Sequence, residues 1–173
     1  MHLNNLNVRN LNIFKTINFI FFFKKMFQYC VWFVLKNNFK KVIDRNAILF
    51  GTSAYIPHIT IKSGLTKNGA QMVANRYKII KPNFEIHGTV VQTHTKVVQG
   101  ICLVDFYALE QHLKANGFES KVHIPLAYRN HPFTDMEIAI ANMSLPSIKT
   151  TEYYVAVADC RYTQDKWCLI DTV

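Results

Sequence analysis

The order of β-rich and helix-forming segments is the feature that most constrains the fold of this chain. Short runs of β-branched and aromatic residues alternate irregularly with longer segments that carry apolar residues at helical spacing. The order is strand, helix, strand, helix, strand, strand, helix, strand, helix, strand, strand. It lacks the strict βαβ alternation of parallel sheets. We therefore predict an α+β fold with a mainly antiparallel sheet.

The boundaries of these segments follow from Gly, Pro and Asn breaks and from capping residues. Asn38 is expected to cap the first helix, and Thr134 or Asp135 the last. Asn116-Gly117 is expected to end the third helix. The predicted strands cover residues 27–35, 56–62, 84–93, 97–107, 122–128, 153–159 and 167–170, and the predicted helices cover residues 39–48, 66–80, 109–115 and 134–142. The last two strands are expected to form a closing hairpin.

The composition is that of one globular domain. Of the 173 residues, 50% are hydrophobic and 18% are charged, which argues against a disordered chain. The formal charge of +9 favours a phosphate-bearing partner. This charge is uneven, because residues 1–25 hold 4 of the 20 basic residues and no acidic one. The remainder has 16 basic and 11 acidic residues, or +5, and is only mildly basic.

The first 25 residues differ from the rest of the chain. They are rich in Asn, Phe, Ile and Lys and contain no Gly, Pro, Asp or Glu. Three interpretations are open: a signal or anchor segment, an organelle-targeting presequence, or AT-rich upstream sequence translated ahead of a start at Met26. The apolar run is too short for a membrane span. We favour the third interpretation and expect residues 1–25 to lie outside a domain that covers residues 26–173.

The four cysteines indicate a reducing compartment. Cys30, Cys102, Cys160 and Cys168 are widely spaced and form no CxxC pair. We interpret them as small core residues and expect neither a disulfide framework nor a zinc site. This predicts a cytoplasmic protein without a metal or another cofactor.

One short motif carries recognisable chemistry: Pro57-His58-Ile59-Thr60-Ile61-Lys62. The two-residue period of a strand places His58 and Thr60 on the same face. An imidazole can transfer a proton near neutral pH, and an adjacent hydroxyl can bind a phosphate oxygen. Motifs of other hydrolases are missing, since the chain has no Gly-rich phosphate loop, GxSxG elbow or HExxH helix.

A histidine, one spacer and a threonine within an apolar strand resemble the signature of the two-histidine (2H) phosphoesterases. The order of a first strand, a short helix and the strand of His58 is similar to that family as well, and the resemblance covers most of residues 27–170. It implies two pseudo-symmetric lobes with flanking helices. Both halves of this chain contain a strand, a helix and then a strand that carries a histidine.

The family has a second such motif, and the matching segment here begins at Val122-His123-Ile124-Pro125. His123 follows His58 by 65 positions, but Pro125 stands where the family has Thr or Ser. Proline supplies no hydroxyl and no backbone donor. The phosphate contact is then lost, or is supplied by Tyr128, Arg129 or Ser120. His87-Gly88-Thr89 is an alternative second motif, ranked lower because it follows His58 by only 29 positions.

The resemblance implies a metal-independent phosphodiesterase with His58 and His123 as general acid and base. Thr60 and Lys62 would contact the phosphate, and Tyr128 and Arg129 the substrate. The implied substrates are RNA 2′,3′-cyclic phosphates, 2′-5′ oligonucleotides or cyclic nucleotides, bound by a monomer without stable membrane association. Two alternatives stay open: a catalytically impaired protein of the same fold that binds RNA or a nucleotide phosphate, and an unrelated membrane-anchored α+β domain.

Overall fold

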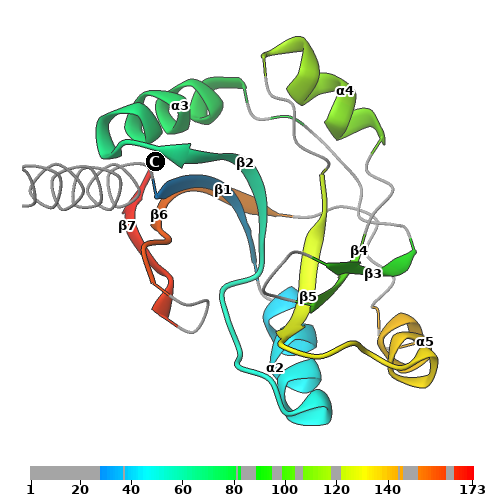
Figure 1. Ribbon diagram of the computed structural model, residues 1–173. Helices are drawn as coiled ribbons and strands as arrows, with labels where there is room; N and C mark the ends of the chain where they lie inside the picture. Colours follow the sequence, from blue (N-terminus) through cyan, green and yellow to red (C-terminus); the bar gives the residue numbers. More distant parts are fainter. Residues whose placement is uncertain are drawn as a thin grey trace, which may run out of the picture.

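Two antiparallel β-sheets and four helices form the part of the chain that this computed structural model describes (Figure 1). The arrangement confirms the predicted α+β class with antiparallel pairing. The described residues are 28–36, 38–80, 82, 89–94, 99–103, 107–117, 122–143, 145, 152–162 and 166–173.

The larger sheet has four strands in the order β2-β1-β6-β7, and every pair is antiparallel. Its strands are β1 (Tyr29–Leu35), β2 (His58–Leu65), β6 (Tyr153–Asp159) and β7 (Cys168–Thr172). The strands β6 and β7 form the predicted closing hairpin. Because β1 lies inside the sheet and both of its faces are covered, six of its seven residues are buried. This explains why β1 reads as a continuous apolar run.

The smaller sheet has three antiparallel strands in the order β3-β4-β5. They are β3 (Val90–His94), β4 (Gln99–Leu103) and β5 (Ile124–Arg129). The strands β2 and β5 are edge strands of different sheets, and they lie next to each other (Figure 1). The two sheets therefore meet along these two strands.

The helices connect and cover the two sheets. They are α2 (Asn38–Phe50), α3 (Lys67–Ile80), α4 (Tyr107–Ala115) and α5 (Asp135–Met143). The helix α3 packs on β1, β2 and β6, whereas α2 crosses to β5 of the other sheet and α5 contacts β3. Because α2 follows β1 in the sequence but packs on the smaller sheet, it ties the two sheets together.

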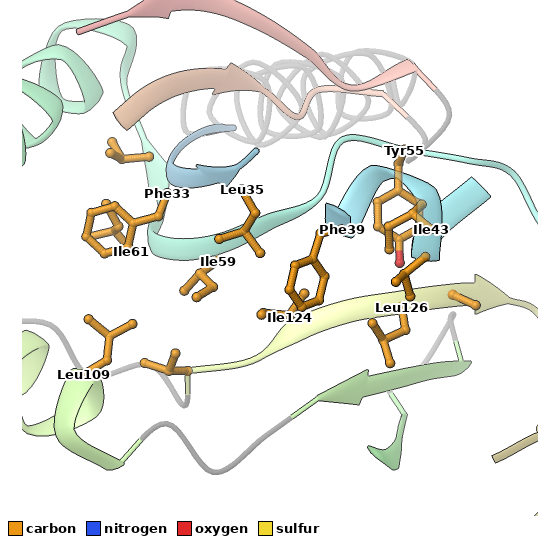
Figure 2. Packing of buried hydrophobic residues seen from close by; sticks show 14 of the residues in the cluster. Phe33, Leu35, Phe39, Ile43, Tyr55, Ile59, Ile61, Leu109, Ile124 and Leu126 are labelled. Carbon is orange, nitrogen blue, oxygen red and sulfur yellow. The ribbon is translucent and has the colours of Figure 1, made fainter. Parts of the chain in front are cut away.

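The main core lies between β2, β5 and the helices. Figure 2 shows Ile59 and Ile61 of β2 together with Ile124 and Leu126 of β5 in this core, and all four side chains are fully buried. Burial of an aliphatic side chain of this size contributes roughly 1.5–3 kcal/mol. These contacts hold the two edge strands close together.

A second, smaller apolar cluster lies on the opposite face of the four-stranded sheet. The residues of β1 alternate between the two faces, so Val31 and Phe33 enter the main core while Trp32 enters the second cluster. The other buried members are Cys30, Val34, Ala156 and Ala158. Val34 lies opposite His58 in the register of β1 and β2, which places His58 beside this second cluster.

Several helices and strands begin or end at other residues than predicted. The first helix runs two residues beyond its predicted end, to Phe50, and ends where Gly51 adopts a positive φ of 61°. The strand β2 begins at His58 instead of residue 56 and continues to Leu65, and β5 begins at Ile124. Thr89 precedes β3 without belonging to it, and Tyr107 begins α4 instead of ending a strand; the other unmatched residues of these two predicted strands lie outside the described residues.

The cap of the last helix is Thr134 and not Asp135. The Thr134 hydroxyl accepts a hydrogen bond from the Glu137 backbone N–H at 3.2 Å, and the Thr134 backbone N–H donates to the Glu137 carboxylate at 2.7 Å. This reciprocal pair is a capping box. Asp135 is the first helical residue.

The interpretation of all four cysteines as core residues is wrong for Cys168. Cys30 and Cys102 are buried, Cys160 is half-buried and Cys168 is exposed, and all four are free thiols. Cys168 lies on β7, the edge strand of its sheet, where every second residue faces outward. A short edge strand leaves half of its side chains uncovered, whatever their polarity.

The predicted N-terminal extension lies outside the described residues, since the description begins at residue 28. The three interpretations of residues 1–25, and the domain start at residue 26, therefore stay predictions. Within the described part of the chain, no helix has the combined length and hydrophobicity that crossing a bilayer requires.

Candidate active site

His58 begins β2 and is held by the segment that leads into the strand. Its Nδ1 lies 2.6 Å from the backbone carbonyl oxygen of Ile56. A carbonyl oxygen only accepts, so Nδ1 carries the proton and donates it. The lone pair of the neutral ring is therefore on Nε2, which is the atom available to receive a proton.

Three aromatic rings surround His58. The Trp32 ring stacks on the imidazole with centroids 3.8 Å apart and an angle of 13° between the planes. Trp167 and Tyr55 approach the imidazole at centroid distances of 6.0 and 6.3 Å, with steep interplanar angles. His58 is only 3% exposed. This histidine is enclosed by apolar surface.

The enclosure changes the acidity of His58. Burial lowers its pKa to about 4, partly opposed by the hydrogen bond to the Ile56 carbonyl and reinforced by the positive charge that His123 can carry. At neutral pH the imidazole is therefore uncharged. An uncharged imidazole with a free Nε2 can act as a base, although its basicity is weaker than that of a solvated histidine.

His123 comes from the second half of the chain and lies directly before β5. It is half-buried, and it is close enough to His58 for the charges of the two rings to interact. The adjacency of β2 and β5 brings the pair together across the boundary between the sheets. The two predicted catalytic residues therefore occupy one region of the molecule.

Thr60 follows His58 on the same face of β2. Its neighbours Ile59 and Ile61 point into the main core (Figure 2), so Thr60 points away from it. Thr60 is half-buried and lies opposite Trp32 in β1. Lys62 is half-buried as well, but the register with β1 shifts between Trp32 and Val31, and Lys62 is paired with Val31, which faces the main core. The strand thus presents an imidazole and a hydroxyl on one face, and the contact of Lys62 with a phosphate stays a prediction.

Tyr128 lies in β5 and extends the aromatic group towards the smaller sheet. Its ring centroid is 5.5 Å from that of Tyr55, and burial raises its pKa well above the usual value for tyrosine. Burial also raises the pKa of Tyr55, whose hydroxyl has no hydrogen-bond partner among the described residues. Both phenols are neutral donors at physiological pH.

Tyr128 rests on Gly100 of the neighbouring strand β4, which gives a test of its placement. A Cβ atom at position 100 would lie 2.9 Å from Cε1 of Tyr128 and 3.1 Å from Oγ1 of Thr93. We expect Gly100→Ala to lower the free energy of unfolding by about 1–3 kcal/mol through overpacking. Urea denaturation measures the loss.

The control for this prediction is the same substitution in a Tyr128→Leu background. A leucine side chain leaves room near the added methyl group, so Gly100→Ala should have a clearly smaller effect there. An equal effect in both backgrounds would show that Tyr128 does not cover Gly100.

Arg129 is engaged within the fold. Its guanidinium makes two hydrogen bonds of 2.7 Å to the Glu137 carboxylate and donates to the backbone carbonyls of His131 and Pro132. It also lies 3.9 Å from the ring centroid of Phe133. Arg129 lowers the pKa of Glu137 to about 2, with further hydrogen bonds from the capping residue of α5. These contacts give Arg129 a structural role that the sequence did not predict, and its predicted contact with substrate stays untested.

The strand β5 accommodates Pro125 because of its position in the sheet. This strand forms the edge of the smaller sheet, and its pairing with β4 is irregular between Ile101 and Cys102, where Pro125 is paired. Proline is tolerated at sheet edges and bulges, since no ladder donor is needed there. Pro125 is buried and leaves the second motif without a hydroxyl at this position.

The alternative second motif lies mostly outside the described residues. His87 and Gly88 are not described, and Thr89 is exposed. The structure therefore does not test this alternative.

Sequence reasoning missed the two tryptophans next to His58. Trp32 lies 26 positions before it and Trp167 lies 109 positions after it. The alternation of β1 indicates that Trp32 and Phe33 face opposite sides, but only the register of β1 with β2 decides which of them meets His58. For Trp167 the sequence carries no comparable signal.

No metal site is evident near these residues. Among the residues described, no group of three or more His, Cys, Asp or Glu side chains is arranged so that it could hold a metal ion.

No family model matches this chain. A search of curated proteins also finds no match. The resemblance to the 2H phosphoesterases therefore depends on the motif residues and their arrangement, and membership of that family stays a prediction.

Proposed function

We propose that this protein is a metal-independent phosphodiesterase of the two-histidine type. The observation that supports the proposal is that His58 and His123 lie on neighbouring strands, close enough for their charges to interact, and come from corresponding places in the two halves of the chain. Each histidine stands at the start of an edge strand, and these two strands are neighbours. This arrangement supports two pseudo-symmetric lobes with the reaction taking place at their boundary.

In the proposed reaction His58 acts as the general base and His123 as the general acid. Nε2 of His58 takes a proton from a water molecule, and the water oxygen forms a bond to phosphorus. The bond between phosphorus and one ribose oxygen then breaks, and that oxygen takes a proton from His123. The tautomer of His58 supports this assignment, because its Nδ1 proton is held by the Ile56 carbonyl.

The neighbouring polar groups would bind the phosphate. The Thr60 hydroxyl is a donor on the same face as His58, and Lys62 adds a positive charge two residues further along β2. Such groups stabilise the negative charge that develops on the phosphoryl oxygens. For the contact that Pro125 does not make, we assign Tyr128 ahead of Arg129, because the guanidinium donors of Arg129 are already engaged.

The substrates proposed are RNA ends with a 2′,3′-cyclic phosphate, 2′-5′ oligonucleotides or cyclic nucleotides. The net positive charge of the chain favours such anions. We further propose that the protein acts as a monomer in the cytoplasm, on an RNA end or a small nucleotide.

A second candidate function is binding without cleavage. Two observations favour it: Pro125 supplies no hydroxyl to the second motif, and a His58 with a pKa of about 4 is a weak base. Such a protein would hold a phosphate between the two sheets without transferring protons. The membrane-anchored alternative depends on residues 1–35, most of which lie outside the described part of the chain.

Hydrolysis by the full-length protein in the presence of EDTA tests the proposal. The substrates are a short RNA that ends in a 2′,3′-cyclic phosphate, 2′-5′ oligoadenylate and cyclic dinucleotides. We expect turnover of at least one of them to a product with a single terminal phosphate monoester, unchanged by EDTA. Activity that disappears with EDTA contradicts the mechanism, and binding without turnover on every substrate supports the second candidate.

A further inference from the structure

The closest aromatic neighbour of His58 is Trp32, and the two rings lie nearly parallel. Their centroids are 3.8 Å apart with 13° between the planes, and the two residues are 1% and 3% exposed. Trp32 is in the adjacent strand β1, opposite Thr60, so the contact runs diagonally between two paired strands. One face of the imidazole is thus covered by the indole.

We propose that Trp32 is a positioning residue for His58, which holds the imidazole in one orientation and keeps water away from it. The inference rests on the proposed function, because orientation matters when Nε2 has to meet a proton on a bound molecule. The Ile56 carbonyl fixes one edge of the ring at Nδ1, and the indole fixes the plane of the ring. Together these contacts leave Nε2 pointing in one direction.

Trp32 is itself held in place by its surroundings. Directly opposite it in β6 is Ala156, whose small side chain leaves room for an indole to lie along the sheet. Trp167 packs against it with centroids 5.7 Å apart, and the Nε1 of Trp167 donates a 3.0 Å hydrogen bond to the Tyr162 carbonyl. Because the indole of Trp32 is held in this way, it can hold the imidazole of His58 in one orientation.

The indole has two opposing effects on the charge of the imidazole. By excluding water it disfavours the imidazolium, and full burial can lower a histidine pKa by about 3–5. By its π electrons it attracts a cation, which raises the pKa by about 1.5 when the pair is desolvated. Exclusion of water is the larger effect, in agreement with the lowered pKa of His58. Trp32 therefore keeps His58 neutral before a substrate anion arrives.

Direct contact with the substrate through the N–H group would be a second role of Trp32, and it can be separated from the positioning of His58. Its Nε1 is buried and has no hydrogen-bond partner among the described residues. A phosphoryl oxygen that binds there would satisfy it. Trp32→Phe keeps a flat ring and removes the N–H, whereas Trp32→Leu removes both, so this pair of variants distinguishes positioning from direct contact.

NMR titration of the His58 ring in the full-length protein tests the inference without any substrate. In the wild type we expect the Nδ1–H tautomer at neutral pH and half-protonation of the ring only at about pH 4. We expect Trp32→Leu to raise the pKa of His58 by at least about 1 through entry of water, and Trp32→Phe to change it by less than half as much. A wild-type ring that titrates near 6.5, or a pKa that is unchanged in both variants, overturns the proposal.

The kinetic counterpart is a loss of kcat at neutral pH. Trp32→Leu should lower kcat by about 10-fold with KM within about 2-fold, and move the acidic limb of the pH profile upward, while Trp32→Phe restores the wild-type profile. Equal losses in both variants would show that the N–H contacts the substrate and would contradict a positioning role.

Phe33→Leu is the matched control for stability. Phe33 is the next residue of β1, is fully buried and faces the main core on the opposite side of the sheet. The Phe33→Leu substitution should lower the free energy of unfolding without changing the titration of His58. A change in that titration as large as the one caused by Trp32→Leu would overturn the inference. A wild type that hydrolyses none of the substrates refutes the proposed function, while the NMR titration still decides the role of Trp32.

Discussion

Replacing His58 by glutamine is expected to lower kcat/KM for the cleaved phosphodiester about 10³-fold, within the range that general acid–base catalysis contributes. Glutamine is uncharged, fills much of the space of the imidazole and has no basic nitrogen. The variant should therefore fold and bind substrate with little change in KM. Steady-state kinetics with EDTA present, together with thermal unfolding of the variant, checks both parts of this expectation.

The same substitution at His123 should cause a loss of similar size. Because the two histidines would act in one proton-transfer step, the double variant should be little worse than either single variant. His131→Gln is the matched control, since His131 is exposed and lies in the loop held by Arg129. A loss below about 10-fold for His58→Gln would exclude it as the general base. Multiplicative losses in the double variant would show that the two residues act independently.

Acidification from pH 7 to pH 4 is expected to remove about 3 kcal/mol from the free energy of unfolding through His58 alone. Its pKa is about 4 in the folded chain and about 6.5 when unfolded. Below pH 6.5 the unfolded chain therefore binds a proton that the folded chain does not bind. The stabilising effect of neutral His58 is thus complete above pH 6.5 and is lost progressively as the pH falls towards 4.

Urea denaturation at pH 7, 5.5 and 4 measures this effect as a difference between the wild type and His58→Gln, because glutamine does not titrate. The pH dependence of the variant should be weaker by about 3 kcal/mol over this interval. Glu137 contributes to the pH dependence only at lower pH. Its pKa of about 2 is below the usual value, so its stabilising effect is lost between about pH 4.5 and 2. Parallel curves for the two proteins above pH 4.5 would show that His58 is not buried as a neutral ring.

Local sequence patterns were sufficient to predict the helices and strands and one side of the candidate site. The strand around His58 could be predicted because alternating apolar residues and a steric preference for extended backbone act over a few neighbours. The same alternation placed Thr60 on the face of His58, but it does not extend to Lys62, because the register of β2 with β1 shifts between these two residues. The order of strands and helices predicted antiparallel α+β architecture, since it lacks βαβ alternation.

Contacts between distant segments were decided only by the tertiary structure. The sequence suggested Arg129 as a ligand of substrate, yet the guanidinium meets Glu137 once β5 and α5 are folded together. It raised doubt about Pro125, whose tolerance follows from the edge position of β5 and the irregular register beside it. It also suggested that Cys168 is buried, whereas β7 is an exposed edge strand.

The stack of Trp32 on His58 shows the physical limit of the sequence most directly. Either side of β1 is apolar enough to be buried, and a shift of the register by one residue would bring Phe33 to the imidazole instead. The choice is made by the packing of β2, α3 and β5 on one face, which involves many residues at once. Backbone conformation is local and is encoded locally, so the helices and strands, the antiparallel class and the side of β2 that carries His58 follow from the sequence. Register and side-chain contact depend on many residues at once, so the side chains that surround this histidine follow only from the packing of the folded chain.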